Sequence, residues 1–429
     1  MAILVTITAL LGWVNERWLG INPVIGVTLG GLLVSLLLLV LGQLGLWGFG
    51  AEFAQEVLGR LDFDELLLHG LLGAILFAGA LDIELNELVA HRWLILVLAT
   101  AGVVVSMILV GTVVWLLAGW MGLELPYFFA LLFGALISPT DPVAVLAILK
   151  RAGTPADLTA LISGESLFND GIGVVVFTVI LGVAVSGHAT VEHVAELFVF
   201  EAMGGVVYGL ALGYAAFVLL RSVDDYAVEI LITMAVVTGG YALALRLHTS
   251  GPLAMVVAGL LIGNRGRALA MSEQTRRNLD TFWVVVDETL NAMLFLLIGL
   301  EVLALELRWE FLVAGLVAVP TVLAARFISV TLPISTIRLR RDVKPYTVRL
   351  LTWGGLRGGI AIALALSIPP RPERDLILAM TYVVVVFSIL VQGLTVEPLA
   401  RRRTAAVGEG SGPASAPLAS SAASPQPTE

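Results

Sequence analysis

Apolar runs long enough to cross a lipid bilayer recur along almost the whole of this 429-residue chain. A helix crosses a bilayer core of about 30 Å with roughly 17 to 25 mostly apolar residues. Hydrophobic residues make up 59% of the chain and charged residues 13%, against about 45–50% and about 25% in ordinary soluble domains. The sequence therefore predicts an all-α integral membrane protein. The thirteen expected transmembrane helices span residues 2–18, 22–41, 64–81, 93–120, 126–149, 157–186, 194–220, 226–246, 250–263, 280–302, 310–331, 347–368 and 375–399.

The distribution of Lys and Arg between the expected loops tests this count, because basic residues accumulate in cytoplasmic loops. If the end that carries Arg401, Arg402 and Arg403 is cytoplasmic, 17 basic residues fall on the cytoplasmic side and five on the other side. The two that remain, Arg326 and Arg357, fall inside expected helices. The asymmetry predicts a multi-pass protein of the cell membrane, with the N-terminus outside and the C-terminus in the cytoplasm.

Composition limits what else the chain can contain. We expect one membrane domain over residues 1–403 and a disordered cytoplasmic tail over 404–429, which is rich in Ala, Ser, Pro and Gly without periodicity. Residues 51–60 and 269–280 have helical spacing with polar faces, so we expect each to form an interfacial helix. The absence of cysteine excludes a disulfide framework and a thiolate metal site. The formal net charge of -9 argues against a nucleic-acid partner, which would need clustered Lys and Arg.

The expected sixth helix carries polar residues in the middle of an apolar run, "LISGESLFNDGIGVVVF" (161–177). Charged side chains inside a membrane cost about 2.5 to 3.5 kcal/mol each on insertion scales, so they are candidates for function. Glu165 and Asn169 are four residues apart, as are Ser166 and Asp170, so all four side chains line one wedge of the helix. Alternatively, these residues could have a purely structural role, as part of a buried ion pair that holds helices together. This alternative is strongest for Glu165.

The expected fifth helix contains "ALISPTDPVAVLAIL", in which Pro139 and Pro142 bracket Thr140 and Asp141. Each proline removes a backbone donor and clashes with the preceding turn, so the helix should be interrupted within the membrane. Freed carbonyl groups near Thr140, together with the Asp141 carboxylate, would make an oxygen-rich site suited to a hard cation. A simple proline kink without a site is the alternative.

The expected twelfth helix is interrupted in a similar way by "GGLRGG", residues 354–359, with Arg357 among four glycines. Broken helices at corresponding positions of two halves indicate a transporter built from inverted repeats, with its site at the midplane. If helices one to six and eight to thirteen form the two halves, the fifth and the twelfth helix are each the fifth of their half. The two halves show no similarity residue by residue. Glycines that serve only close packing are the alternative.

The segments "SPTDPVAVLAIL", "GESLFNDG" and "GGLRGG" together resemble the signature segments of the NhaP-type sodium/proton antiporters. This branch of the monovalent cation:proton antiporters includes the animal sodium/proton exchangers. The resemblance also covers "SGPLAMVVAGLLIGN" and "NAMLFLLIGLEV". It implies crossing broken helices, a core and a dimerisation subdomain, and a homodimer.

The resemblance also implies roles for single residues. Asp170 would bind the cation and the proton alternately, and Asn169 is its partner in the Asn-Asp pair of the electroneutral branch. Thr140, Asp141 and Ser166 would complete the shell of a bound Na⁺. Three further residues are implied in support of the site: Glu165 and Arg357 as a structural ion pair, and Arg326 as a second arginine near the core.

Two positions depart from the family pattern. Relatives often carry a glutamate in the third helix, where this chain has Ala78, and another after the tryptophan of the tenth helix, where it has Val284. Asp287 and Glu288 lie nearby, and the sequence leaves open whether either one replaces these carboxylates.

Exchange follows physically from competition at one group. Burial disfavours an ionised carboxylate, which can be neutralised by a proton or by Na⁺ but hardly by both at once. We therefore predict one-for-one exchange at Asp170, by movement of the bundle of helices five, six, twelve and thirteen against the rest. No lysine lies in an expected span, which favours electroneutral transport. The sequence does not decide between Na⁺, Li⁺ and K⁺.

Other classes of protein fit less well. A cation channel or an electrogenic K⁺/H⁺ carrier could also use broken helices and oxygen ligands. An intramembrane aspartyl protease would pair Asp141 with Asp170, but the chain lacks the Gly-x-Gly-Asp arrangement of such proteases. It also lacks the HExxH motif of zinc enzymes. We expect a transporter rather than an enzyme, with no cofactor and with the cation and the proton as its substrates.

Overall fold

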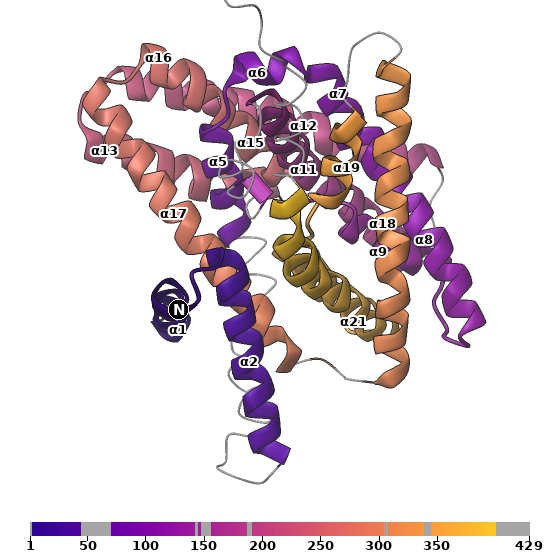
Figure 1. Ribbon diagram of the computed structural model, residues 1–429. Coiled ribbons are helices and arrows are strands. Elements are labelled where there is room, and N and C mark those ends of the chain that lie inside the picture. Colours follow the sequence, from indigo (N-terminus) through magenta and orange to yellow (C-terminus); the bar gives the residue numbers. More distant parts are fainter. Residues whose placement is uncertain are drawn as a thin grey trace, which may run out of the picture.

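The computed structural model describes residues 2–43, 70–141, 145–146, 156–186, 191–303, 305, 308–338 and 345–399. Within these ranges the chain is almost entirely helical (Figure 1). The expected tail, residues 404–429, lies outside the described residues. So does the expected interfacial helix at residues 51–60.

Every one of the thirteen expected spans contains helix in the part of the chain that the structure describes. The first seven spans correspond to α1 (Ala2–Val14), α2 (Pro23–Gln43), α5 (Leu72–Leu81), α7 to α8 (Arg92–Val97 and Val103–Trp120), α9 (Tyr127–Ile137), α11 (Ala156–Ser186) and α12 (Val191–Arg221). The other six correspond to α13 and α14 (Tyr226–Ala235 and Tyr241–Arg246), α15 (Gly251–Leu261), α17 (Glu273–Leu300), α18 (Trp309–Arg338), α19 and α20 (Pro345–Trp353 and Gly359–Leu366) and α21 (Pro372–Phe387). Two short helices, α6 (Leu85–Ala90) and α16 (Arg267–Leu269), lie between spans.

Eight helical stretches in the described ranges are long and apolar enough to cross a membrane. They are Pro23–Leu41, Arg92–Trp120, Leu158–Ser186, Val194–Arg221, Tyr226–Arg246, Glu273–Leu303, Trp309–Thr336 and Pro372–Leu399. The apolar helices α5 and α9 are shorter. The protein is therefore a multi-span membrane protein, as composition predicts.

The tenth span begins earlier than expected. Residues 269–280 were expected to form a separate interfacial helix, but most of them belong to α17, which starts at Glu273. The Ser272 hydroxyl accepts a hydrogen bond from the backbone N–H of Thr275 at 3.4 Å, and so caps the helix. A capped N-terminus lets the polar first turns continue into the apolar span without a break.

Among the described residues, the helices pack through three clusters of buried apolar residues, one of which is much larger than the other two. The buried residues of the largest cluster come from α8, α9, α11, α17, α18, α20 and α21, for example Phe133, Phe295 and Ile362. Helix α9 lies against α8, α18 against both α8 and α21, and α2 against α17 (Figure 1). Close approach depends on glycine at Gly134, where a β-carbon would overlap the Met107 carbonyl oxygen of α8.

The two predicted helix breaks meet. Helix α9 ends at Ile137, and the chain from Pro139 to Asp141 is not helical. Helix α19 ends at Trp353 and α20 begins at Gly359. The Asp141 backbone N–H donates to the Leu356 carbonyl oxygen at 2.8 Å, in an isolated antiparallel bridge. The chain thus runs in opposite directions through the two breaks, as an inverted repeat requires, and the prediction of two crossing broken helices is confirmed.

Candidate functional site

The polar wedge of the sixth span lies against the break of the fifth. Glu165, Ser166, Asn169 and Asp170 of α11 are all buried, and Asp170 is 5% exposed. Gly173, one turn further along, leaves room for the ring of Pro139, because a β-carbon at this position would overlap that ring. The four side chains expected to share one face therefore do so, and that face meets the break.

Asn169 holds Thr140 in place from two sides. Its Nδ2 donates to the Thr140 Oγ1 at 2.9 Å, and its Oδ1 accepts from the Thr140 backbone N–H at 3.2 Å. The Ser166 hydroxyl lies 3.1 Å from the Thr140 hydroxyl. Because the break leaves the Thr140 backbone without an intrahelical partner, these bonds satisfy groups that the interruption exposes. Three of the predicted site residues therefore form one hydrogen-bonded unit.

Both aspartates belong to the same site. Asp141 follows Thr140 in the break, and its carboxylate lies directly over Gly358, where any β-carbon would overlap it. Asp170 lies one turn along α11 from Ser166, whose hydroxyl contacts that of Thr140, so the two aspartates flank the same contact. Two carboxylates beside two hydroxyl groups make an all-oxygen set, which is the donor chemistry that hard cations prefer.

The ion pair of Glu165 is different from the one expected. Glu165 was expected to pair with Arg357, but both of its oxygens accept hydrogen bonds from Arg326 of α18, at 2.6 and 2.8 Å. Its Oε1 also accepts from Asn169 Nδ2 at 3.2 Å. Arg326 donates further to the carbonyl oxygen of Leu351 at 3.2 Å, just before the twelfth-helix break. The pair therefore ties α11, α18 and α19 together behind the site.

Arg357 instead binds the open end of α9. Its Nη1 donates to the carbonyl oxygen of Pro139 at 2.6 Å and to that of Ser138, while its backbone N–H donates to the Ser388 hydroxyl at 2.9 Å. A cation at a helix C-terminus satisfies unpaired carbonyl groups and the negative end of the helix dipole. Two of the carbonyl groups that were expected near a bound cation are thus already bound by the guanidinium.

Sequence reasoning missed the groups that hold Arg357 and Arg326. The partners are the Ser138, Pro139 and Leu351 carbonyl oxygens and the Ser388 hydroxyl. Backbone carbonyl groups carry no sequence signal. Ser388 looks like any other small polar residue within an apolar helix, so its role emerges only from the fold.

Asp287 lies on the face of α17 that reaches the crossing. Asn291 Nδ2 donates to the Asp287 carboxylate and to its carbonyl oxygen, at 2.9 Å each. Leu294, on the same face, packs against Gly359 at the start of α20. Asp287 is half-buried and interacts electrostatically with Asp141, whereas Glu288 is exposed. Val284 stands where relatives often have a glutamate. Of the two carboxylates near it, Asp287 and Glu288, only Asp287 faces the site.

Known proteins resemble this chain over most of its length. Residues 4–402 match the family described as "Sodium/hydrogen exchanger, transmembrane". The chain is 50% identical to the Na(+)/H(+) antiporter NhaP of Pseudomonas aeruginosa over 94% of this chain and 96% of that protein. It is 37% identical to the Na(+)/H(+) antiporter NhaH of Halobacillus dabanensis over 79% of this chain and 83% of that protein.

The fold is also that of a solved structure. The sodium proton antiporter MjNhaP1 from Methanocaldococcus jannaschii, solved at pH 8, superposes with a TM-score of 0.73 at 19% identity. The superposition covers 93% of this chain and 96% of that chain. The motifs, the crossing breaks and the similarity over nearly the full length agree: this chain belongs to the sodium/hydrogen exchanger family.

Proposed function

We propose that this protein exchanges Na⁺ for H⁺ across the membrane by alternating access. The relatives at 50% and 37% identity are both named Na(+)/H(+) antiporters. The observation that carries the proposal is the unit of Asn169, Thr140 and Ser166, which holds hydroxyl oxygens beside the buried Asp170 and the partly buried Asp141 at the crossing of two broken helices.

Asp170 is the exchanging group in this proposal. It bears a proton on one half of the cycle and contacts Na⁺ on the other, with Thr140, Ser166 and Asp141 supplying further oxygens. A buried carboxylate is costly when it is charged and bare, so release of one ligand favours capture of the other. Asn169 acts beside it as a neutral holder of Thr140 and does not titrate.

The proposed one-for-one stoichiometry assigns the exchanged proton to Asp170 and leaves the charges of Asp141, Glu165 and Arg357 unchanged through the cycle. Glu165 is engaged by Arg326 in two charge-assisted hydrogen bonds, so it is not free to carry a second proton. Arg357 remains positively charged and bound to carbonyl groups. One proton exchanged for one Na⁺ at Asp170 leaves the net charge of the site unchanged, and the proposed transport is electroneutral.

The proposal extends to the location, oligomeric state and orientation of the protein. The protein would lie in the plasma membrane as a homodimer, with its N-terminus outside and its C-terminus, including a disordered tail over 404–429, in the cytoplasm. The asymmetry of 17 basic residues against five supports this orientation.

Purified protein in sealed liposomes tests the proposal. An imposed Na⁺ gradient should drive protons in the opposite direction, and a potential-sensitive dye should show no change in membrane potential. Net current with the flux would indicate a channel or an electrogenic carrier and would refute electroneutral exchange. Repeating the assay with Li⁺ and K⁺ decides the selectivity among the alkali ions.

A further inference from the structure

One nitrogen of Arg357 is buried and lacks a partner. Nη1 binds two carbonyl groups, but Nη2 finds no acceptor among the residues that the structure describes. The residue is 2% exposed, so bulk water does not solvate this nitrogen. A buried guanidinium N–H without an acceptor is strongly unfavourable, and such groups in native proteins are normally satisfied by protein or by ordered water.

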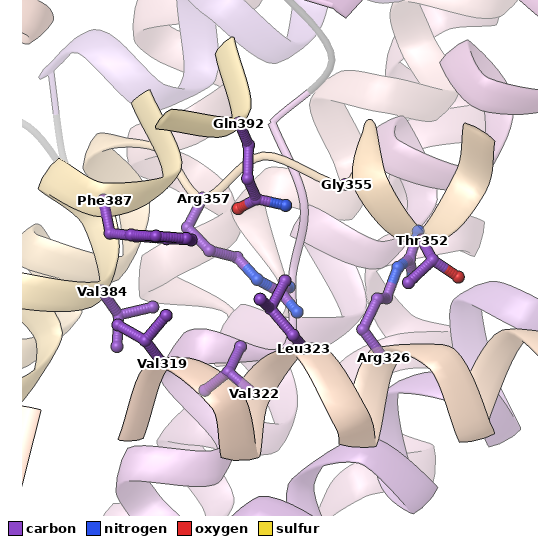
Figure 2. Close-up of a pocket in the computed structure, with 10 residues that line it drawn as sticks. All are labelled: Val319, Val322, Leu323, Arg326, Thr352, Gly355, Arg357, Val384, Phe387 and Gln392. Atoms are coloured by element: carbon purple, nitrogen blue, oxygen red, sulfur yellow. The ribbon is translucent and has the colours of Figure 1, made fainter. Parts of the chain in front are cut away.

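The side chain of Arg357 lines a small cavity between α18, α19 and α21. Figure 2 shows its guanidinium in the middle of the lining, with Leu323 and Arg326 of α18 on one side and Gln392 above it. The space open to the centre of a water-sized sphere is about 10 Å³. This is about the smallest space that holds one water molecule, and a water can occupy such a space where polar groups in its lining bind it.

A second polar side chain faces the same space. Gln392 is buried, and its Nε2 donates to the carbonyl oxygen of Trp353 at 3.0 Å. Because this bond occupies Nε2, the amide oxygen is the acceptor that Gln392 brings to the cavity, whose lining includes this side chain (Figure 2). An N–H donor and an amide acceptor therefore border a cavity that has room for one molecule able both to accept and to donate.

We propose that this cavity is a binding site for one ordered water molecule, which accepts a hydrogen bond from Arg357 Nη2 and donates one to the Gln392 amide oxygen. A cation is excluded by the two guanidinium groups in the lining. An anion is disfavoured because Glu165 already neutralises Arg326 and because Asp170 lies near Arg357. The water completes the solvation of the arginine on the side away from α9.

The water gives Arg357 a fixed orientation. With Nη2 held, Nη1 stays on the carbonyl groups of Ser138 and Pro139, directly before Thr140. Arg357 and its water are thus positioning groups for the break of the fifth helix. The positioning role rests on the proposed function of the site in Na⁺/H⁺ exchange, whereas the water site itself does not.

The same helix offers a matched control. A second cavity, also about 10 Å³, lies along α18 between α8 and α21. Every residue that lines it is apolar, including Ala318, Val317 and Met380. Apolar cavities of this kind stay dry. Filling it should therefore not displace a bound water, whereas filling the cavity beside Arg357 should.

Two measurements test the water site without relying on transport. A cryo-electron microscopy map that resolves ordered waters should show density within hydrogen-bond distance of Arg357 Nη2 and the Gln392 amide oxygen. An empty cavity in such a map, or a feature that gains scattering when bromide replaces chloride, would overturn the proposal. The second measurement is thermal unfolding of Val322→Leu, which fills the polar cavity, and of Ala318→Val, which fills the apolar one.

The unfolding temperature of Val322→Leu should lie at least about 2 °C below that of the parent, because the larger side chain displaces the water and leaves Arg357 Nη2 without a hydrogen-bond acceptor. Ala318→Val should unfold at the parent temperature or above it. Equal shifts in the two variants would refute the water site. In transport, Val322→Leu should raise the apparent KM for Na⁺ more than Ala318→Val does. An equal KM in the two would refute the positioning role alone.

Discussion

The backbone N–H of Asp141 is hydrogen-bonded to the carbonyl oxygen of Leu356 at 2.8 Å, so the interruptions of two helices that are distant in the sequence meet at one point. Each break gives the other a partner for backbone groups that an apolar surrounding would otherwise leave unpaired. The same crossing places Asp141 over Gly358 and Thr140 against Asn169. Predictions about the site therefore concern residues whose positions depend on both breaks.

Replacing Asp170 with asparagine should abolish exchange, because an amide neither takes up and releases a proton nor neutralises Na⁺. The side chains are of equal size, so the unfolding temperature should stay within about 2 °C of the parent. Sodium-driven proton flux in liposomes measures the loss. Glu273→Gln, at the exposed start of α17, is the matched control and should transport normally. Substantial flux through Asp170→Asn would show that another group exchanges the ions.

Removing Glu165 should destabilise the protein through Arg326 rather than Arg357. Glu165→Gln leaves the buried Arg326 without its charge partner, and breaking such a pair costs about 3 to 5 kcal/mol of unfolding free energy. A double-mutant cycle of Glu165→Gln with Arg326→Gln should show strong coupling. The cycle with Arg357→Gln should show weaker coupling. If the second cycle couples as strongly as the first, the pairing with Arg326 is wrong.

Thr140→Val should weaken Na⁺ binding, because it removes the hydroxyl that contacts both Asn169 and Ser166. Loss of a ligand worth about 1.4 kcal/mol raises the apparent KM about tenfold. Thr140→Ser keeps the hydroxyl and should stay near the parent value. Kinetics of both variants over a range of Na⁺ concentrations provide the comparison, and the same KM in both would rule out a role for the hydroxyl.

Asp287→Asn should raise the apparent KM for Na⁺, since it removes a negative charge near Asp141 on the face of α17 that reaches the crossing. The effect should shrink as ionic strength rises, because salt screens attraction between charges. Glu288→Gln removes an exposed carboxylate from the adjacent position and is the control. Equal effects of the two substitutions would mean that only the general surface charge of α17 matters.

The apparent KM for Na⁺ should rise as the pH falls. A proton and Na⁺ compete for the Asp170 carboxylate, so acid lowers the fraction of sites open to the cation. In the acidic limit, one-for-one competition gives about a tenfold rise for each unit of pH, while the maximal rate at saturating Na⁺ is not limited by that competition. Initial rates measured at equal pH on both sides of the membrane test this. A slope near two decades per unit would indicate two exchanged protons.

The location of the site was predictable from local patterns. Apolar runs of membrane length predicted the helices, and the polar residues within them predicted where function lies, because ionisable groups in a bilayer are costly. Pro139 and the glycines around Arg357 predicted the two breaks from backbone chemistry alone. Glu165, Ser166, Asn169 and Asp170 were correctly placed on one face of α11, since helical spacing needs no tertiary information.

Partner choice was not predictable in the same way. Arg326 and Arg357 both fall in the interior of expected helices, and the sequence allows either one to reach Glu165. Only the family resemblance favoured Arg357. The fold places Arg326 of α18 against the carboxylate and turns Arg357 toward the carbonyl groups of Ser138 and Pro139. Those carbonyl groups can accept hydrogen bonds from Arg357 only because α9 ends at the break. Residue types in the sequence do not show which backbone groups are available.

Three properties of this protein could be read from local sequence: that it is a bundle of membrane helices, which of these helices are broken, and which helices carry carboxylates within the membrane. These properties follow from the length of apolar runs, the backbone preferences of proline and glycine, and the helical period. The arginine that neutralises Glu165, the hydrogen bonds between Asn169 and Thr140, and the carbonyl groups that Arg357 binds depend on the packing of the helices. Such pairings depend on distances of about 3 Å between residues far apart in the chain, and hydrogen bonds weaken steeply outside that range.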